Sequence, residues 1–217
     1  MTKPELVTAL PGPLTKAVLE RDGDVISPSY TRGYPLAIAR GRGVWVWDVD
    51  GNRFLDFNAG VAVCATGHAH PRVVRAIRRQ AGQFLHYSGT DFYYEVEVAL
   101  AERLAAISPT DRPAKVFFCN SGAEAMEAAN KLARFRTGRP YLVSFHGSFH
   151  GRTMGALSLT YSKPVQRRGF GPFLPGVLHV PYGDCFRCVL NERPDRCGLA
   201  CLQYIEERVL GRGVDPA

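Results

Sequence analysis

The pattern of hydrophobic and polar positions changes character along the chain. The first forty residues are rich in Pro, Gly and other turn-forming residues and have no regular period, which is typical of an arm laid on another surface. Two β-rich runs follow within residues 43–57 (GVWVWDVDGNRFLDF), and the Asp50-Gly51 pair between them favours a hairpin turn. The sequence therefore predicts a small antiparallel β unit after an irregular arm.

Helical periodicity begins after a Gly-rich stretch. Residues 71–84 place apolar side chains on one face and arginines outside it, and Pro71 stands in the first turn, where proline favours a helix. A second helix is expected over residues 95–107. The elements expected after it are strands at 115–119, 141–145 and 177–180 and helices at 123–136 and 199–210. Strands that alternate with helices indicate βαβ units and a parallel sheet, so the predicted fold class is α/β.

Composition places the chain among ordinary packed proteins and narrows its partners. Of its 217 residues, 46% are hydrophobic and 22% are charged, and the formal net charge is +7. This charge suits an anionic substrate or an acidic partner. The arginines fall singly or in pairs among acids and apolar residues, without the basic tracts or basic-aromatic alternation of nucleic-acid-binding proteins. We therefore expect no nucleic-acid partner.

Secretion and membrane insertion require apolar stretches. No part of the sequence approaches the roughly 18 to 20 consecutive apolar residues that span a bilayer. The first residues also lack the apolar core of a signal peptide. The expectation is a cytoplasmic protein with no membrane partner.

Four of the six cysteines cluster late in the chain. Cys185 and Cys188 are spaced C-x2-C, Cys197 and Cys201 are spaced C-x3-C, and eight residues separate the pairs. Such a set can close around one zinc ion. Against this interpretation, free cysteines near the start of a helix often simply pack as small apolar groups. Both interpretations stay open, and no metal ligand is assigned.

Candidate chemistry begins where the strand expected at 115–119 passes through Asn120-Ser121-Gly122-Ala123 into a helix. Small residues let a ligand approach the backbone, and the first N–H groups of a helix are unpaired at the positive end of its dipole. A phosphate group would fit there. The alternative is that Asn120 or Ser121 only caps the helix.

A second group of candidate residues, HGSFHGRT at 146–153, follows the strand expected at 141–145. In a doubly wound sheet, ligands gather at the carboxyl ends of the strands, so both groups are expected to face one crevice. The ring of Phe149 and the imidazoles of His146 and His150 would suit a flat, phosphorylated heteroaromatic cofactor. Taken alone, each histidine is more often a structural hydrogen-bonding group than a catalytic one.

Several blocks together resemble the N-terminal half of the class III (omega) pyridoxal-phosphate-dependent aminotransferases, the family of 4-aminobutyrate, ornithine and acetylornithine aminotransferases. The blocks are the segment around Tyr34, GVWVWDVDGNRFLDF, FNAGVAVCATGHAHP, NSGAEAMEAANKLAR and FHGSFHGRTMGALSLT. The resemblance implies fold type I. Residues 1–65 would form the N-terminal arm and β-hairpin of the small domain, and residues 66–217 the first half of the large cofactor domain with its mainly parallel sheet.

The resemblance also implies how the cofactor, pyridoxal 5'-phosphate, is held. Ser121, Gly122 and Ala123 correspond to the loop that binds its phosphate through backbone amides and the serine hydroxyl. Phe149 corresponds to the aromatic residue that stacks on the pyridine ring. His150 lies beside the ring and is expected to have a supporting role.

Two further positions are expected to contact the substrate. Val61 corresponds to an apolar position near the substrate in the family, and Tyr34 to a position at the mouth of the site. Glu124 and Glu127 continue the helix after the phosphate loop and are expected to be structural.

The activity implied is transfer of an amino group from an amine or amino acid, such as 4-aminobutyrate, ornithine or acetylornithine, to a 2-oxo acid by a homodimer. Family members are longer, and their Schiff-base lysine corresponds to a position after Ala217. None of the five lysines here stands in that context. No catalytic residue is therefore assigned, and the stretch alone is expected to be an inactive fragment. The alternatives are a racemase or aminomutase of the same fold, and a non-catalytic remnant whose cysteine cluster binds metal.

Overall fold

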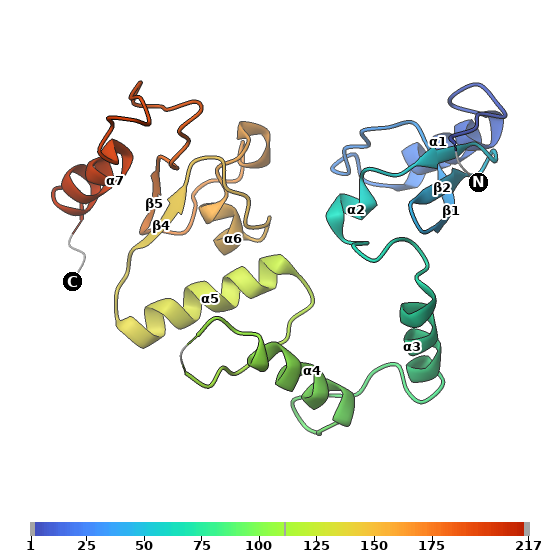
Figure 1. Cartoon of the computed structure of the whole chain (residues 1–217), viewed down its shortest axis with the longest axis horizontal. Coiled ribbons are helices and arrows are strands. Elements are labelled where there is room, and N and C mark those ends of the chain that lie inside the picture. Colours follow the sequence, from blue (N-terminus) through green and yellow to red (C-terminus); the bar gives the residue numbers. More distant parts are fainter. Residues whose placement is uncertain (1–2, 111, 215–217) are drawn as a thin grey trace. The chain divides into compact units, whose positions relative to one another are not determined.

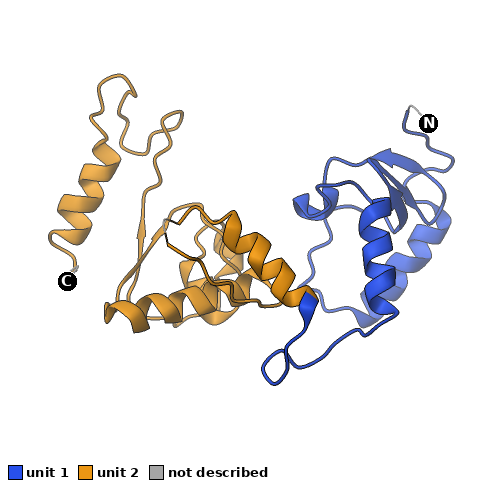
Figure 2. Ribbon diagram, turned by 60° about the horizontal axis from the view of Figure 1, so that its bottom comes forward, with its two compact units in different colours: residues 1–95 blue, residues 96–217 orange. Residues whose placement is uncertain are grey.

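A computed structural model describes residues 3–110 and 112–214 (Figure 1). They form two compact units, residues 1–95 and 96–217, which Figure 2 shows in blue and orange. This division follows from the contacts that the residues of each unit make with one another. The domain boundary at residue 65, which the resemblance implies, stays a prediction. Among the described residues, no helix is both long and apolar enough to cross a bilayer.

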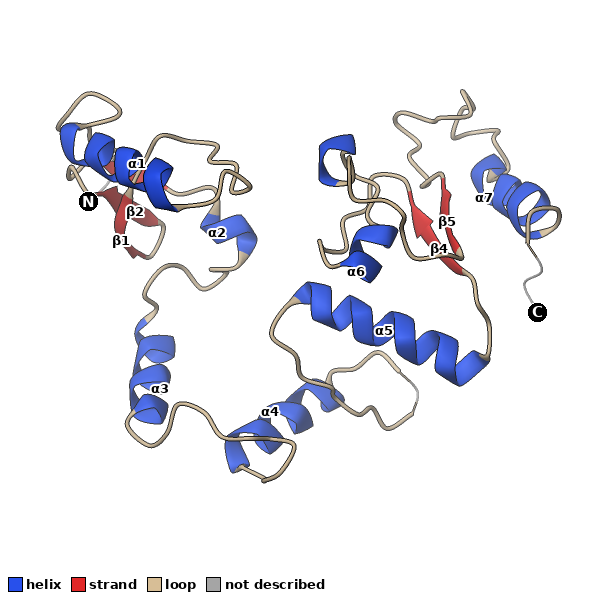
Figure 3. Ribbon diagram, turned by 180° about the vertical axis from the view of Figure 1, so that it is seen from behind, coloured by secondary structure: helices blue, strands red, loops and turns tan. Residues whose placement is uncertain are grey.

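The first unit is built on a three-stranded antiparallel sheet (Figure 3). Its strands, in spatial order, are β1 (Ile38–Arg42), β2 (Trp45–Asp48) and β3 (Arg53–Leu55). Val46 of β2 pairs with Phe54 of β3, and Gly51 in the turn between them has φ +90°, which glycine adopts without strain. The hairpin expected within residues 43–57 is therefore confirmed, and β1 is an additional strand on its outer side.

The N-terminal arm lies on the turn of this hairpin. The side-chain carbonyl of Asn52 accepts hydrogen bonds from the backbone amides of Val7 (2.7 Å) and Thr8 (3.0 Å). The side-chain amide of Asn52 donates to the Thr8 hydroxyl (2.9 Å) and to the carboxylate of Asp48 (2.7 Å). Asn52 is fully buried, so these bonds form in an environment where water cannot replace them.

Helix α1 (Pro13–Val25) lies in the arm that was expected to have no regular structure, and that expectation is wrong. The carboxylate of Asp50 accepts hydrogen bonds from the amides of Leu14 and Thr15, each at 2.8 Å. These are two of the amides that a helix cannot bond internally. The hairpin turn therefore supplies the N-terminal cap of α1 from 35 residues away in the chain.

Two further helices confirm the periodicity of the sequence. Helix α3 (Pro71–Ala81) begins at the expected proline, and α4 (Glu95–Ala106) ends before Ser108 and Pro109. Arg78 and Arg79 lie in the last turn of α3, where positive charge is favourable at the negative end of the helix dipole.

The second unit contains a parallel β-helix-β arrangement (Figure 3). Its elements after α4 are α5 (Gly122–Thr137), β4 (Leu142–Phe145), α6 (Met154–Leu159), the 3-10 turn η1 (Pro164–Gln166), β5 (Val177–Val180), α7 (Ala200–Tyr204) and the π-helical stretch η2 (Ile205–Leu210). Strands β4 and β5 pair in parallel, with Ser144 opposite His179. The α/β fold class is confirmed, and the helix expected over residues 199–210 continues from α7 into η2.

The prediction of a strand at residues 115–119 is wrong. This segment forms no strand among the described residues, and Phe117 leaves 74% of its side chain exposed. The apolar run is suited to a buried strand, but a strand exists only through ladder hydrogen bonds to a neighbour. No described segment provides that neighbour.

A carboxylate from α5 joins this helix to α6, which runs beside it in Figure 1. Glu127 accepts hydrogen bonds from the Thr153 hydroxyl (2.6 Å) and from the amides of Gly155 (2.9 Å) and Ala156 (3.1 Å). It therefore caps the start of α6 from outside that helix. The hydrogen bond from Thr153, with the two amide bonds, holds the pKa of Glu127 below its ordinary value, although partial burial opposes this shift. The structural role expected for Glu127 is observed.

We expect Asn52→Ala to lower the free energy of unfolding of the first unit by about 2 kcal/mol, because it leaves buried partners unpaired. Residue-resolved hydrogen exchange measures the local effect. The amides of Val7 and Thr8 should exchange at least about tenfold faster, which corresponds to about 1.4 kcal/mol.

The amides of Leu14 and Thr15 provide an internal control, because their acceptor is Asp50 and not Asn52. Gln83→Ala removes an exposed amide from the same unit and should change none of these rates. Equal exchange of Val7 and Thr8 in wild type and Asn52→Ala would show that the arm is held by other contacts.

Glu127→Gln keeps the shape of the side chain and removes its charge. The folded-state pKa of Glu127 lies below the unfolded one, so its stabilising effect is full above an unfolded value near 4.5 and disappears as the pH falls through the folded pKa. We expect the variant to be about 1 kcal/mol less stable at pH 7. In urea titrations at several pH values, this difference should shrink on acidification, whereas exposed Glu102→Gln should show no such trend. A difference that is independent of pH would contradict the assignment.

Candidate functional site

The turn that leads into α5 is held by its own side chains. The Ser121 hydroxyl oxygen accepts a hydrogen bond from the Glu124 amide (3.2 Å), and the Glu124 carboxylate accepts one from the Asn120 amide (2.6 Å). This arrangement is close to a capping box, in which a serine and a glutamate three residues later satisfy the helix start. Ser121 is therefore the helix cap, and Glu124 has the structural role expected of it.

The same turn leaves the backbone amides of Gly122 and Ala123 without an acceptor among the described residues. A Cβ added at Gly122 would meet no atom within 4 Å, so there is open space beside this residue. The positive end of the helix dipole is at the same place. The Ser121 hydroxyl accepts a bond and still has its own proton to donate, so capping and anion binding are compatible here.

The loop after β4 is held against the segment that follows α6. The Ser148 hydroxyl donates to the carbonyl of Leu159 (2.9 Å), and the His150 amide donates to the Thr160 hydroxyl (2.9 Å). Phe149 lies between these two held residues, and 54% of its side chain is exposed. The loop therefore presents an open aromatic ring on a backbone that is fixed on both sides, with half-buried His150 next to it.

Gly151 brings the two segments together. Its φ is +132°, a conformation that other residues adopt only with strain. A Cβ at this position would lie 2.7 Å from the Cβ of Ala123 and 3.0 Å from that of Ala156. The loop that carries Phe149 therefore passes directly against the first turn of α5. Gly151 was not among the predicted site residues, and the available signal was its place in a run of small residues.

Tyr34 and Val61 lie in the first unit. Tyr34 is 75% exposed and lines a cavity of about 750 Å³ that is formed within residues 31–68, together with Phe57 and His68. Val61 is 85% exposed, and its neighbour Gly60 lines the same cavity. The structure thus places these two residues at or next to one cavity, whereas the residues assigned to the cofactor belong to the second unit.

The segment that carries Val61, labelled α2 (Ala59–Ala62), is a left-handed turn with φ between +49° and +65° at all four residues. This conformation costs L-residues about 1–2 kcal/mol each. Its backbone is held by the Asn58 side chain, which accepts from the Val61 amide (2.8 Å), and by the Asp56 carboxylate, which accepts from the amides of Asn58 (2.8 Å) and Ala59 (3.1 Å). Strain that surrounding contacts maintain in this way is concentrated at functional sites.

Asp56 also pairs with His68, whose Nε2 lies 2.5 Å from Oδ2 of the carboxylate. This hydrogen bond is the largest reason why the pKa of Asp56 lies below its ordinary value, and the amide of Asn58 adds to the shift. The carboxylate is therefore ionised at neutral pH and remains a strong acceptor for the left-handed turn.

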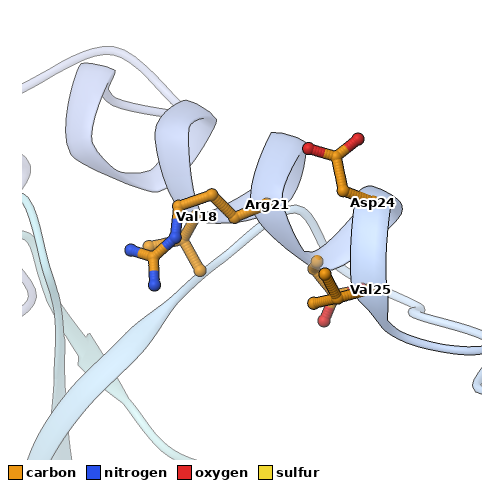
Figure 4. A pocket seen from close by; sticks show the side chains of 5 residues that line it. Val18, Arg21, Asp24 and Val25 are labelled. Carbon is orange, nitrogen blue, oxygen red and sulfur yellow. The ribbon is translucent and has the colours of Figure 1, made fainter.

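A hollow along α1 does not bring together side chains that could act jointly on a ligand (Figure 4). It measures about 480 Å³ and is lined by five residues of this one helix. In Figure 4 the side chains of Arg21 and Asp24 point to different sides. Its other acid, Asp22, is bound to Arg32 at 2.8 Å.

The four late cysteines do not converge. Cys185, Cys188, Cys197 and Cys201 are free thiols. In the part of the chain that the structure describes, no three His, Cys, Asp or Glu side chains are grouped so that they could hold a metal ion. The zinc interpretation of their spacing has no support in this arrangement.

Comparison with known proteins identifies relatives along most of the chain. A model of the family described as aminotransferase class-III matches residues 26–211. The chain is 37% identical over 221 residues to an alanine/serine racemase of Pyrococcus horikoshii, covering 100% of this chain and 46% of the relative. It is 52% identical over 149 residues to an acetylornithine aminotransferase of Streptomyces coelicolor, covering 69% and 36%. It is 41% identical over 182 residues to a 4-aminobutyrate aminotransferase of Mycobacterium tuberculosis, covering 84% and 40%. The chain thus spans less than half the length of these relatives.

Solved structures agree with these relatives. An omega transaminase from Pseudomonas jessenii, in complex with PMP, superposes with a TM-score of 0.80 at 28% identity, covering 89% of this chain and 46% of that one. The ornithine aminotransferase from Toxoplasma gondii gives a TM-score of 0.69 at 31% identity, covering 79% and 41%. The fold type I class expected from the resemblance is confirmed. On the evidence of the family match over residues 26–211 and of these relatives, the chain belongs to the class-III aminotransferases.

Proposed function

We propose that this chain supplies the cofactor-binding part of a pyridoxal-phosphate-dependent aminotransferase. The observation that carries the proposal is the close approach at Gly151, which sets the loop of Phe149 against the helix start where two amides lack acceptors among the described residues. A phosphate on the helix and a ring on the loop match the two parts of this cofactor. Membership of the class-III aminotransferases supports the same cofactor.

The Ser121 hydroxyl and the amides of Gly122 and Ala123 would hold the phosphate. These three donors and the positive end of α5 favour a doubly charged oxyanion. Phe149 would pack on the pyridine ring, because an open aromatic face on a fixed backbone suits stacking. His150, half-buried beside it, is proposed to have a supporting role.

Pyridoxal phosphate, when bound, supplies the electron sink through which an amino group leaves one carbon and joins another. The part of this chain in that reaction is placement, since fixing the phosphate and the ring plane removes much of the entropic barrier. No residue of the chain is assigned a proton-transfer role. We also propose that the stretch alone is inactive, because none of its lysines stands in the Schiff-base context of the family.

We propose an amine or amino acid donor similar to 4-aminobutyrate, ornithine or acetylornithine, and a 2-oxo acid acceptor. The named activities of the Streptomyces coelicolor and Mycobacterium tuberculosis relatives support this substrate class. Val61 and Tyr34 are proposed to contact the substrate, since both are largely exposed at or beside one cavity. A homodimer and a cytoplasmic location stay predictions.

A second candidate function is racemisation or amino-group migration on the same fold. The observation that favours it is the similarity to the alanine/serine racemase of Pyrococcus horikoshii, which extends over the whole chain. Binding of the cofactor does not distinguish the two reactions, because both use the same phosphate and ring contacts.

The natural gene product, loaded with pyridoxal phosphate, separates the candidates. Incubation with acetylornithine, ornithine or 4-aminobutyrate and 2-oxoglutarate should form glutamate. Racemisation of alanine or serine without consumption of the 2-oxo acid would identify the alternative. A protein that does neither would contradict both functions.

Ser121→Asp tests the phosphate site without removing the helix cap, because aspartate is also a good N-cap. The new carboxylate repels a phosphate and has no proton to donate. We expect the affinity for pyridoxamine phosphate, which cannot react with lysines, to fall at least about tenfold, or about 1.4 kcal/mol. Fluorescence titration measures the affinity, and circular dichroism should show unchanged helix content. Equal affinity in wild type and variant would place the phosphate elsewhere.

Phe149→Ala removes the proposed stacking face. We expect a loss of affinity of about 1 kcal/mol, or several-fold, for the same ligand. Phe186→Ala is the matched control, because Phe186 belongs to the same unit and is 89% exposed. Equal losses in the two variants would show that Phe149 has no specific contact with the ring.

A further inference from the structure

The second unit contains another cavity, around η1, that shares no lining residue with the proposed cofactor site. It measures about 470 Å³. Its lining residues are Tyr161, Lys163, Pro164, Arg167, Arg168 and Phe173. Three of these six side chains are cations and none is acidic.

These cations also lack carboxylate partners. Within residues 3–110 and 112–214, no Asp or Glu oxygen lies within 4.0 Å of Lys163, Arg167 or Arg168. Three positive charges around one hollow create a local positive potential, which concentrates anions there. Elsewhere in the same unit, Arg193 does lie beside a carboxylate, that of Asp195.

Arg167 is held between two aromatic rings. Its guanidinium carbon lies 4.4 Å from the ring centroid of Phe173 and 5.1 Å from that of Tyr161. Packing against the rings restricts the guanidinium, which is the group that binds a carboxylate or phosphate through two parallel hydrogen bonds.

The Nε atom of Arg167 is buried and has no hydrogen-bond partner among the described residues. A buried donor without a partner costs about 1–3 kcal/mol, so native proteins seldom leave one. An oxyanion in the cavity would remove this cost. This donor is a second observation, independent of the charge count, that points to a ligand.

The ring of Tyr161 also connects this cavity to two histidines. His146 stacks on it at 4.7 Å and His179 lies at 4.5 Å between ring centroids. Burial, followed by the charges of Arg167 and His146, lowers the pKa of His179 from its ordinary value. His179 therefore reports on the charge of Arg167 without lining the cavity.

We propose that this cavity is an oxyanion-binding site, which takes a compact ligand through a phosphate or carboxylate group. Arg167 binds the oxyanion through its guanidinium, and Lys163 and Arg168 add positive charge at the rim. The site is distinct from the helix start at Ser121, and its ligand is not the proposed cofactor.

The experiment is a titration of the 217-residue chain with inorganic phosphate and, separately, with succinate, followed by the imidazole signals of His179 in NMR spectra. Either ion should give a saturable shift, because neutralising Arg167 changes the field at His179. The shift should weaken as sodium chloride is added. Comparison of the two ions shows whether a phosphate or a carboxylate is preferred.

Three variants locate the binding. The Arg167→Gln variant should bind the ions with an affinity at least tenfold lower, measured through the saturable shift of His179. Arg167→Lys keeps the charge but not the planar fork, and we expect its affinity to fall several-fold while the protein stays folded. Arg75→Gln removes an exposed arginine of α3 and should have no effect.

Phosphate can also bind at the start of α5, and Ser121→Asp separates the two sites. In this variant the shift of His179 with phosphate should persist, which keeps the outcome independent of the proposed function. The proposal is overturned if neither ion gives a saturable shift, or if Arg167→Gln responds like wild type. It is also overturned if only a poly-glutamate peptide binds, because the cavity would then be a surface for a protein partner.

Discussion

The contact between Gly151 and Ala123 sets the geometry of the second unit. Two segments that are far apart in the chain approach so closely that no side chain fits between them. One segment ends in backbone donors and the other carries an open aromatic ring, so the contact brings these two features to one place. It also relates the fixed loop around Ser148 to the fixed cap at Ser121.

Carboxylates that accept backbone hydrogen bonds recur throughout the structure. Asp50 caps α1, Glu127 caps α6, and Asp56 supports the left-handed turn at 59–62. Each one satisfies donors that the local backbone cannot satisfy by itself. Several acidic residues of this basic chain are thus used as internal acceptors. Cations such as Arg167 are correspondingly left without a carboxylate among the described residues.

Local sequence patterns predicted the elements whose causes are local. The hairpin at 43–57 follows from its Asp-Gly turn, helix α3 from its periodicity and the proline in its first turn, and helix α5 from the Ser121 cap at its own start. Helix α1 could not be predicted in this way because its cap, Asp50, lies in a distant turn. The apolar run at 115–119 gave a false strand because the run shows suitability for pairing and says nothing about a partner.

The candidate site shows the same difference between features that local sequence determines and features that distant residues determine. Ser121 and Phe149 can be proposed from the sequence because motif and residue type mark them, whereas the close approach of Gly151 depends on a positive φ and a distant neighbour. Nothing in the sequence beyond the neighbouring Arg168 marks Arg167, since the two rings that lie beside it come from different positions of the chain.

The left-handed turn at 59–62 has a consequence at the level of the gene. Three of its four residues are alanine or valine, each of which is separated from glycine by one base change. Glycine would remove the conformational penalty at any of these positions. A more stable turn is therefore one mutation away. Val61 in this turn thus holds an exposed apolar side chain at a cost in folding stability.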